Sequence, residues 1–339
     1  MRAMTQSRRI VLATRPTGMC DGDTVRTEVV PIPEPADGEA VVRLKWISID
    51  PTIRTWMDDA PGYLPPIELG AVIRSGGIGE VVASENDAYP VGATVFGMFG
   101  WQDHTVIGGA HGNAQIVPDG VDPTAALSVF GTTGMTAYFG LLDIGRPEPG
   151  NTVVVSGAAG ATGSIVGQIA KIKGAANVVG IAGTDEKCAW LVDELGFDAA
   201  INYRTEHVEE RLRELCPDGI DVYFDNVGGE ILDACLGQLA LRARVVCCGA
   251  ISSYNGRESL PGVKNTFNLI IQRARMEGFL ILDYLDRFSE AQADMVTWVL
   301  EGKIAHRVHV VDGLEESLNA LNLLFTGGNT GKVIVKVED

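Results

Sequence analysis

The segment that decides the fold is VVVSGAAGATGS, residues 153–164, in which three valines run into a glycine-rich turn. Ile165, Ile169 and Ile172 then repeat with the period of a helix. A strand, a glycine-rich turn and a helix in this order match the dinucleotide-binding fingerprint. Its second glycine lets backbone approach a pyrophosphate and its third lets the helix pack on the strand, roles available to Gly160 and Gly163.

The turn departs from the fingerprint at its first position, where Ala158 stands. Gly157 beside it can absorb the strain of the turn. The amino terminus of the following helix supplies unpaired N–H groups, which bind phosphate. A tight strand-to-helix turn without a ligand is the alternative interpretation.

The second strand of this unit indicates which dinucleotide binds. It ends in GIAGT, residues 180–184, without the acidic residue that normally accepts from the ribose hydroxyls. Lys187 follows, and the third strand ends at Tyr203 and Arg204. A cation together with a hydroxyl suits a 2′-phosphate, so the sequence predicts NADP(H). The alternative for Lys187 is a solvated helix residue.

The chain around the turn alternates apolar strands with amphipathic helices, which is the pattern of a parallel sheet covered on both faces. Strands are expected at residues 152–156, 177–182, 199–203, 219–225 and 243–249. Helices are expected at residues 124–127, 136–142, 161–173, 185–195, 208–216, 230–239 and 263–275. The sequence therefore predicts a doubly wound α/β domain.

The first 120 residues and the tail have a different pattern. Short alternating strands such as 40–47 and 93–98 lie between Gly- and Pro-rich turns, which favours a β-barrel or sandwich. In the tail, expected strands at 307–311 and 332–337 flank a helix at 315–324. The tail strands fit the barrel better than the parallel sheet, so the α/β domain is expected to be inserted into the first.

Composition describes a globular protein and excludes several partners. Of 339 residues, 44 are acidic and 27 basic, and the net charge of −17 disfavours nucleic acid and anionic membranes. The sequence has neither an apolar run long enough for a membrane span nor a signal-like start, which predicts a cytoplasmic location. The six cysteines contain no C-x-x-C pair and are interpreted as buried thiols.

Six motifs resemble the medium-chain dehydrogenases/reductases, within them the leukotriene B4 dehydrogenase and prostaglandin reductase group, which includes 2-alkenal and curcumin reductases. They are IDPTIR (49–54), GMFGWQD (97–103), GMTAYFGLL (134–142), SGAAGATG (156–163), YFDNVGG (223–229) and GAISSYN (249–255). The resemblance covers essentially the whole chain. It implies a GroES-like β-barrel catalytic domain at residues 1–127 and 306–339, and a Rossmann NADP-binding domain at 128–305.

The resemblance also implies the activity and the contacts of the site. The activity is NADPH-dependent hydride transfer to the C=C bond of an α,β-unsaturated ketone or aldehyde, by a homodimer. The residues implied to contact NADP(H) are Gly160, Ala161, Thr162, Gly163, Lys187, Tyr203, Asn226, Cys248, Gly249, Ala250, Ile251, Ser252, Ser253, Phe279, Leu280, Ile281 and Asn329. Related sequences usually carry an aromatic residue at the position of Thr52 and Met-Pro at the positions of Thr132 and Thr133. The substrate preference of this chain is therefore expected to be its own.

Zinc ligands are missing where the zinc enzymes of this superfamily have them. Those enzymes need a cysteine near Asp50 and a Gly-His-Glu motif near Gly70, where this chain has SIDP (48–51) and LGAV (69–72). His306 and His309 point to opposite faces if they lie on a strand. The sequence therefore predicts no metal, and without a Lewis acid simple alcohol oxidation is the poorer candidate.

In a conjugate reduction, the hydride adds to the β carbon and negative charge collects on the carbonyl oxygen, which needs a hydrogen-bond donor. The resemblance suggests Tyr254 as this catalytic donor; the alternative is a loop residue that packs on the cofactor. Asp225 is interpreted as a strand-end cap. Competing functions are an NADPH quinone reductase of the same superfamily, and an NADPH-binding regulatory protein with little turnover.

Overall fold

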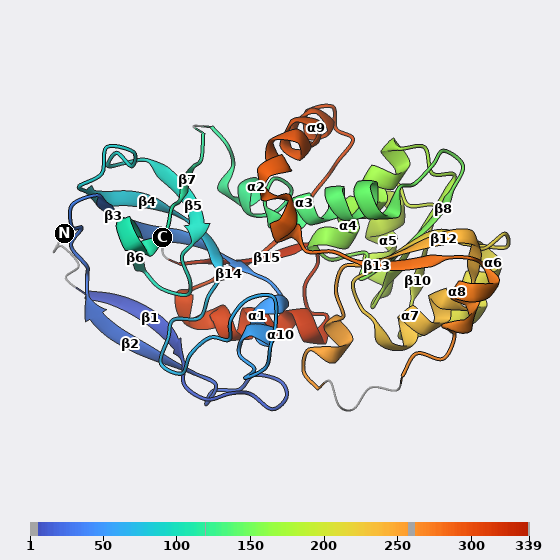
Figure 1. Cartoon of the computed structure of the whole chain (residues 1–339), viewed down its shortest axis with the longest axis horizontal. Coiled ribbons are helices and arrows are strands. Elements are labelled where there is room, and N and C mark those ends of the chain that lie inside the picture. Colours follow the sequence, from blue (N-terminus) through green and yellow to red (C-terminus); the bar gives the residue numbers. More distant parts are fainter. Residues whose placement is uncertain (1–5, 119, 257–261, 338–339) are drawn as a thin grey trace. The chain divides into compact units, whose positions relative to one another are not determined.

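The computed structural model describes residues 6–118, 120–256 and 262–337, and the chain divides into two compact units (Figure 1). The first unit comprises residues 1–127, 308–329 and 333–339, and the second comprises 128–307 and 330–332. The sequence places all of 306–339 with the first domain. Residues 306–307 and 330–332 fall instead in the second unit, where the Gly331 amide donates to the Ala159 carbonyl at 2.8 Å.

The second unit is built on a six-stranded sheet with the order β10-β9-β8-β11-β12-β13, and its neighbouring strands pair in parallel. The strands are β8 (Thr152–Ser156), β9 (Asn177–Ala182), β10 (Ala199–Asn202), β11 (Ile220–Asp225), β12 (Leu239–Cys247) and β13 (Arg275–Gly278). Counted from β8, the order is 3-2-1-4-5-6, that of a doubly wound dinucleotide-binding fold. The predicted α/β Rossmann fold is confirmed.

Helices cover this sheet (Figure 1). The helices of this unit are α3 (Thr132–Phe139), α4 (Ala161–Ile172), α5 (Asp185–Asp193), α6 (Val208–Leu215), α7 (Gly229–Leu236), α8 (Phe267–Ile271) and α9 (Phe288–Leu300). Of these, α9 packs on α3, where Trp298 stacks on Tyr138, and not on the sheet itself. Because both faces of a parallel sheet are covered, the valines of β8 at 153, 154 and 155 are fully buried. The core between sheet and helices includes Val154, Val179, Leu212, Tyr223 and Leu236.

The structure corrects two of the expected helices and adds one that the sequence does not predict. Of residues 263–275, only Phe267–Ile271 forms a helix, because Arg273 adopts a left-handed backbone (φ 50°) and the chain then enters β13. The helix expected at 136–142 begins earlier, at Thr132, and continues as a π-helical turn over Gly140–Gly145. Helix α9 was absent from the sequence-based assignment.

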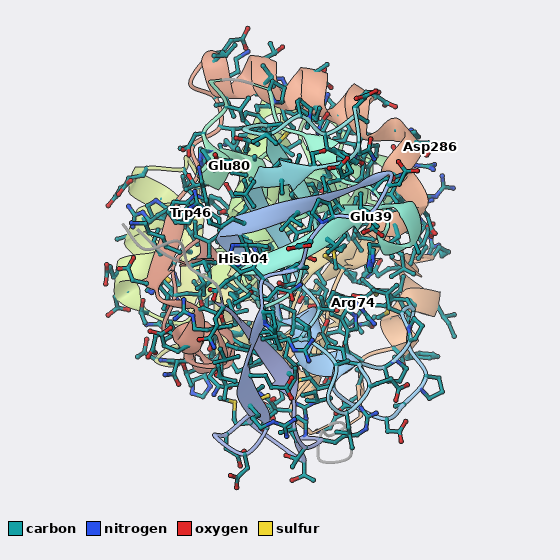
Figure 2. The ribbon with its side chains drawn as sticks, turned by 90° about the vertical axis from the view of Figure 1, so that its left-hand side faces the viewer. Glu39, Trp46, Arg74, Glu80, His104 and Asp286 are labelled. Carbon is teal, nitrogen blue, oxygen red and sulfur yellow. The ribbon has the colours of Figure 1, made fainter. Side chains whose placement is uncertain are left out.

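The first unit holds a seven-stranded sheet with the order β14-β15-β3-β4-β5-β7, in which β6 also pairs with β3. The strands are β3 (Glu39–Ile49), β4 (Gly76–Ser84), β5 (Thr94–Met98), β6 (His104–Gly108), β7 (Gln115–Ile116), β14 (Val308–Asp312) and β15 (Lys332–Lys336). Trp46, Glu80 and His104 mark β3, β4 and β6 in Figure 2. Because β15 pairs antiparallel with β3, the tail completes this sheet.

A hairpin and three helices complete the first unit. The hairpin pairs β1 (Gln6–Leu12) with β2 (Val25–Pro31), and the helices are α1 (Thr52–Trp56), α2 (Pro123–Leu127) and α10 (Ser317–Thr326). The unit has its own core, which includes Ile47, Trp101 and Leu321.

Two further predictions concern membrane-spanning helices and the state of the cysteines. Among the described residues, no helix is long and apolar enough to cross a membrane. All six cysteines are free thiols; Cys20, Cys216 and Cys235 are buried and the other three are half-buried. Burial raises the pKa of the Cys216 thiol to about 11, which keeps it protonated near neutral pH.

Candidate active site

The predicted cofactor residues of the second unit gather at one edge of its sheet. Strands β8 and β11 are neighbours at the point where the strand order reverses, and ligands of such sheets bind outside the carboxyl ends there. The residues that follow these ends are Gly160–Gly163 after β8, Lys187 after β9, Tyr203 after β10, Asn226 after β11, 248–254 after β12, and Phe279, Leu280 and Ile281 after β13. Carboxyl ends of parallel strands share one edge, so the structure brings these residues to a common site.

The glycine-rich turn has the geometry that a pyrophosphate requires. Gly157 takes the left-handed backbone at φ 57°, which accommodates Ala158 at the first fingerprint position. A Cβ atom on Gly163 would lie 2.5 Å from the Gly157 carbonyl oxygen, so only glycine lets α4 pack this closely on the turn. Gly160 caps α4, and the first N–H groups of a helix lack intrahelical acceptors. The turn therefore fits an anionic group at the amino end of α4.

A carboxylate joins the ends of β8 and β11. Asp225 is 2 % exposed and accepts from the Tyr223 hydroxyl at 2.7 Å and from the Ser156 hydroxyl at 3.0 Å. The same oxygen accepts from the amides of Val227 and Gly228 at 3.0 Å. One oxygen of this carboxylate therefore accepts four hydrogen bonds, two of them from the turn after β11, which confirms its interpretation as a strand-end cap.

Asn226 ties the same two strands together from the other side. Its side-chain amide donates to the Ser156 carbonyl at 2.7 Å, and its backbone amide donates to the Ser156 hydroxyl at 2.9 Å. Asn226 is therefore fixed at the point where the strand order reverses. Its contact with the cofactor stays a prediction.

The loop after β12 is attached to the end of β11. The amides of Cys248 and Gly249 donate to the Asp225 carbonyl at 2.9 and 3.0 Å. Tyr254 folds back over this loop, where its hydroxyl oxygen accepts from the Ala250 amide at 3.2 Å. A Cβ on Gly249 would lie 3.3 Å from that hydroxyl, so the small residue leaves room for it. The Tyr254 oxygen is thus anchored beside the carboxyl end of β12.

The segment after β13 packs on α3 and the π-helical turn. A Cβ on Gly140 would lie 2.5 Å from the Phe279 ring, so the ring lies directly against the Gly140 backbone. Phe279 also meets Tyr284 edge-on, with ring centroids 6.3 Å apart. Phe279 is therefore held by packing, whereas Leu280 is 37 % exposed.

A cationic corner lies at the carboxyl ends of β9 and β10. Thr184 caps α5 by accepting from the Lys187 amide at 3.2 Å. A Cβ on Gly183 would lie 3.0 Å from the Tyr203 hydroxyl, so this ring packs on the Gly183 backbone. The Arg204 guanidinium lies 5.9 Å from the Tyr203 ring centroid. The sequence predicts that Lys187 and Tyr203 contact the 2′-phosphate, and the structure places Arg204 next to these two residues.

The pKa of Lys187 reflects its burial and a second cation, Arg204, close to it. Burial, followed by repulsion from Arg204, holds the pKa of Lys187 below its ordinary value. The signal for Arg204 in the sequence is its place directly after Tyr203 at a strand end. Two cations with a hydroxyl suit a phosphate group.

Some residues of the first unit also have predicted roles, which stay predictions. Asn329 lies in this unit and is 8 % exposed. Of the aromatic residues near the barrel motifs, Phe99 and Trp101 are buried in the core, whereas Tyr63 is 44 % exposed and hydrogen-bonds with the Thr52 hydroxyl. Over the described part of the chain, no three His, Cys, Asp or Glu side chains form a group that could hold a metal ion.

Comparisons with known proteins define the class. Residues 8–115 match the family model described as the N-terminal domain of oxidoreductase, and residues 161–300 match the model described as zinc-binding dehydrogenase. Together with the strand order and the glycine-rich turn, these matches place the chain in the medium-chain dehydrogenase/reductase family.

Individual relatives narrow the class to a group. The chain is 45 % identical to the putative NADP-dependent oxidoreductase YfmJ of Bacillus subtilis, over 99 % of both chains. It is 40 % identical to the NADPH-dependent curcumin reductase of Escherichia coli, over 98 % of this chain and 97 % of the relative. The structure of CurA from Vibrio vulnificus in complex with NADPH superposes with a TM-score of 0.92 and 41 % identity, over 98 % of this chain and 99 % of that one. The chain belongs to the group of curcumin and prostaglandin reductases.

Proposed function

We propose that this chain is an NADPH-dependent reductase that transfers a hydride to the carbon–carbon double bond of α,β-unsaturated ketones and aldehydes. The names of its relatives support NADPH as the reductant and small conjugated molecules as the substrates. The geometry of the second unit supports the same assignment, because its predicted cofactor residues follow the carboxyl ends of adjacent strands.

In this proposal, the two ends of the cofactor are held by different elements. The backbone at Gly160–Gly163 holds the pyrophosphate, and Lys187 with Tyr203 and Arg204 holds the 2′-phosphate. Asn226 and the 248–253 loop contact the nicotinamide half, with Phe279–Ile281 and Asn329 completing its surroundings. When bound, NADPH supplies the hydride that adds to the β carbon.

The observation that carries the proposal is the anchored hydroxyl of Tyr254. Its oxygen accepts from the Ala250 amide, which holds the hydroxyl beside the carboxyl end of β12, and a tyrosine hydroxyl is a hydrogen-bond donor as well as an acceptor. A donor aimed at the substrate carbonyl oxygen stabilises the negative charge that develops there. Water then protonates the α carbon, so that the product is the saturated carbonyl compound.

The reaction is proposed to proceed without zinc. The positions that hold zinc in related alcohol dehydrogenases are occupied by Ser48, Ile49 and Asp50, and by Gly70 and Ala71, and they offer neither thiolate nor imidazole. A conjugated double bond accepts hydride with the help of a hydrogen bond alone. Overnight dialysis against a chelator should therefore leave turnover unchanged.

The homodimer is proposed to form through β13. This strand ends the sheet order, all four of its residues are exposed, and Met276 is 40 % exposed. On the neighbouring α8, Phe267 and Ile270 are 66 % and 69 % exposed. A second copy that pairs β13 with β13 would cover this edge and continue the sheet.

The test of the activity is NADPH oxidation over a panel of conjugated enones and enals, a quinone and a simple aldehyde. We expect turnover of the enones with loss of the double bond, and no reduction of the simple aldehyde. Rapid turnover of the quinone alone would favour the quinone reductase alternative. No turnover of any compound by protein that binds NADPH would favour the regulatory alternative and refute the proposal.

A further inference from the structure

Asn202, the last residue of β10, lies beneath the cationic corner and is only 5 % exposed. The sequence contains no signal for its role, because its partners lie on another helix and in the following turn. Buried amide side chains need hydrogen-bond partners, so the identity of these partners defines what the residue does.

The side-chain amide of Asn202 restrains a carboxylate. Its Nδ2 donates to Oδ1 of Asp185 at 2.6 Å. Asp185 opens α5, three residues after the end of β9. In folds of this type, an acid near the end of the second strand accepts from the ribose hydroxyls of NAD and repels a 2′-phosphate. Asp185 is therefore an acid close to the position that selects NAD, with its carboxylate bound to Asn202.

The other polar atoms of Asn202 shape the segment that carries the cations. Its Oδ1 accepts from the Arg204 amide at 3.1 Å, and its backbone N–H donates to Oε2 of Glu206 at 2.7 Å. Glu206 also pairs with Arg211 at 2.8 Å. The buried side-chain amide of Asn202 thus binds Asp185 and fixes the backbone of Arg204. The backbone N–H of Asn202 binds a second carboxylate, that of Glu206.

We propose that Asn202 is a positioning residue for NADPH selectivity, which holds the Asp185 carboxylate and orients Arg204 so that this corner accepts a 2′-phosphate. The inference rests on the proposed use of NADPH. It adds that this chain has an acid close to the NAD-selecting position and that a hydrogen bond from Asn202 holds this acid.

The experiment compares NADPH and NADH affinities by fluorescence titration in four variants of the full chain. Asn202→Asp removes the donor to Asp185 but retains an acceptor for the Arg204 amide. The double variant Asn202→Asp with Asp185→Asn exchanges the two groups, so donor and acceptor are restored and net charge equals that of the parent. Asn202→Ala frees Asp185 without adding charge and serves if Asn202→Asp does not fold.

The matched control is Asn177→Asp. Asn177 is the first residue of β9 and therefore lies at the amino ends of the strands, whereas the cationic corner lies at their carboxyl ends. Its side-chain amide donates to the Leu215 carbonyl at 2.8 Å. This substitution makes the same chemical change away from the cationic corner. It should leave the ratio of NADPH to NADH affinity unchanged.

We expect Asn202→Asp to weaken NADPH binding about ten- to hundred-fold, the range of one charged hydrogen bond, and to change NADH binding less than about three-fold. Asn202→Ala should weaken NADPH selectively by a smaller factor, and the exchanged pair should recover NADPH affinity. Equal weakening of both cofactors, or an exchanged pair that stays as weak as Asn202→Asp, would overturn the inference. A parent protein that does not prefer NADPH would instead refute the proposed function.

Discussion

Replacing Gly163 with alanine should destabilise the second unit because the new methyl group has no space. The added Cβ would lie 2.5 Å from the Gly157 carbonyl oxygen and 2.8 Å from the Ala158 Cα, both backbone atoms that no rotamer change can move. Overpacking of this kind costs about 1–3 kcal/mol, and rigid neighbours place it near the upper value. Alanine recovers about 1 kcal/mol of helix propensity. The net loss in the free energy of unfolding should be about 2 kcal/mol.

Thermal unfolding measures this loss, and Gly160→Ala is the matched comparison. A unit of this size loses about 2–4 °C per kcal/mol, so Gly163→Ala should unfold about 4–8 °C below the parent. At Gly160 the nearest contact of an added Cβ is the Gly157 carbonyl oxygen, at 3.2 Å, so that variant should lose less than about 1 kcal/mol. It should nevertheless weaken NADPH by at least about ten-fold if backbone must approach the pyrophosphate there. Unchanged stability of Gly163→Ala, together with unchanged NADPH affinity of Gly160→Ala, would refute this description of the turn.

Four further predictions concern the cationic corner, the Tyr254 hydroxyl and the sheet edge. Lys187→Ala should weaken NADPH about ten- to hundred-fold and NADH little in fluorescence titration, and equal losses would contradict the phosphate assignment. Because burial and Arg204 lower the pKa of Lys187, its positive charge is lost at a lower pH than that of an ordinary lysine, so NADPH affinity of the parent should fall as pH rises while NADH affinity stays level. Tyr254→Phe should lower kcat for an enone about 10²–10³-fold with NADPH affinity nearly intact, and unchanged kcat would reduce Tyr254 to a packing role. Met276→Glu should convert a dimer to monomers in analytical ultracentrifugation, whereas a dimer that persists would exclude β13 as the interface.

Sequence reasoning succeeds here where a local pattern decides the structure. The bounds of β8 and β9 agree to the residue with the predicted strands, because each is a compact apolar run that ends at a turn. The spacing of the glycine-rich turn likewise predicts the roles of Gly157 and Gly163 in the turn. These features depend on neighbours along the chain.

The features that the sequence did not reveal depend on long-range contacts. Strand β13 forms because its backbone pairs with β12. The apolar periodicity of residues 263–275 gives no information about this pairing. The hydrogen bond from Asn202 to Asp185 joins residues 17 positions apart, so the neighbours of either residue along the chain do not indicate it. The bond between Gly331 and Ala159 similarly connects the tail to the phosphate turn.

A deuterium-transfer experiment shows directly whether the hydride of NADPH reaches the β carbon of an enone. NADPH carrying deuterium at the transferable position of nicotinamide is incubated with the protein and a conjugated enone, and the product is analysed by NMR and mass spectrometry. We expect a saturated ketone with one deuterium on its β carbon and a solvent proton on its α carbon. Deuterium on the carbonyl carbon, as in an allylic alcohol, would contradict hydride transfer to the β carbon. So would an incubation in which neither the enone nor NADPH is consumed.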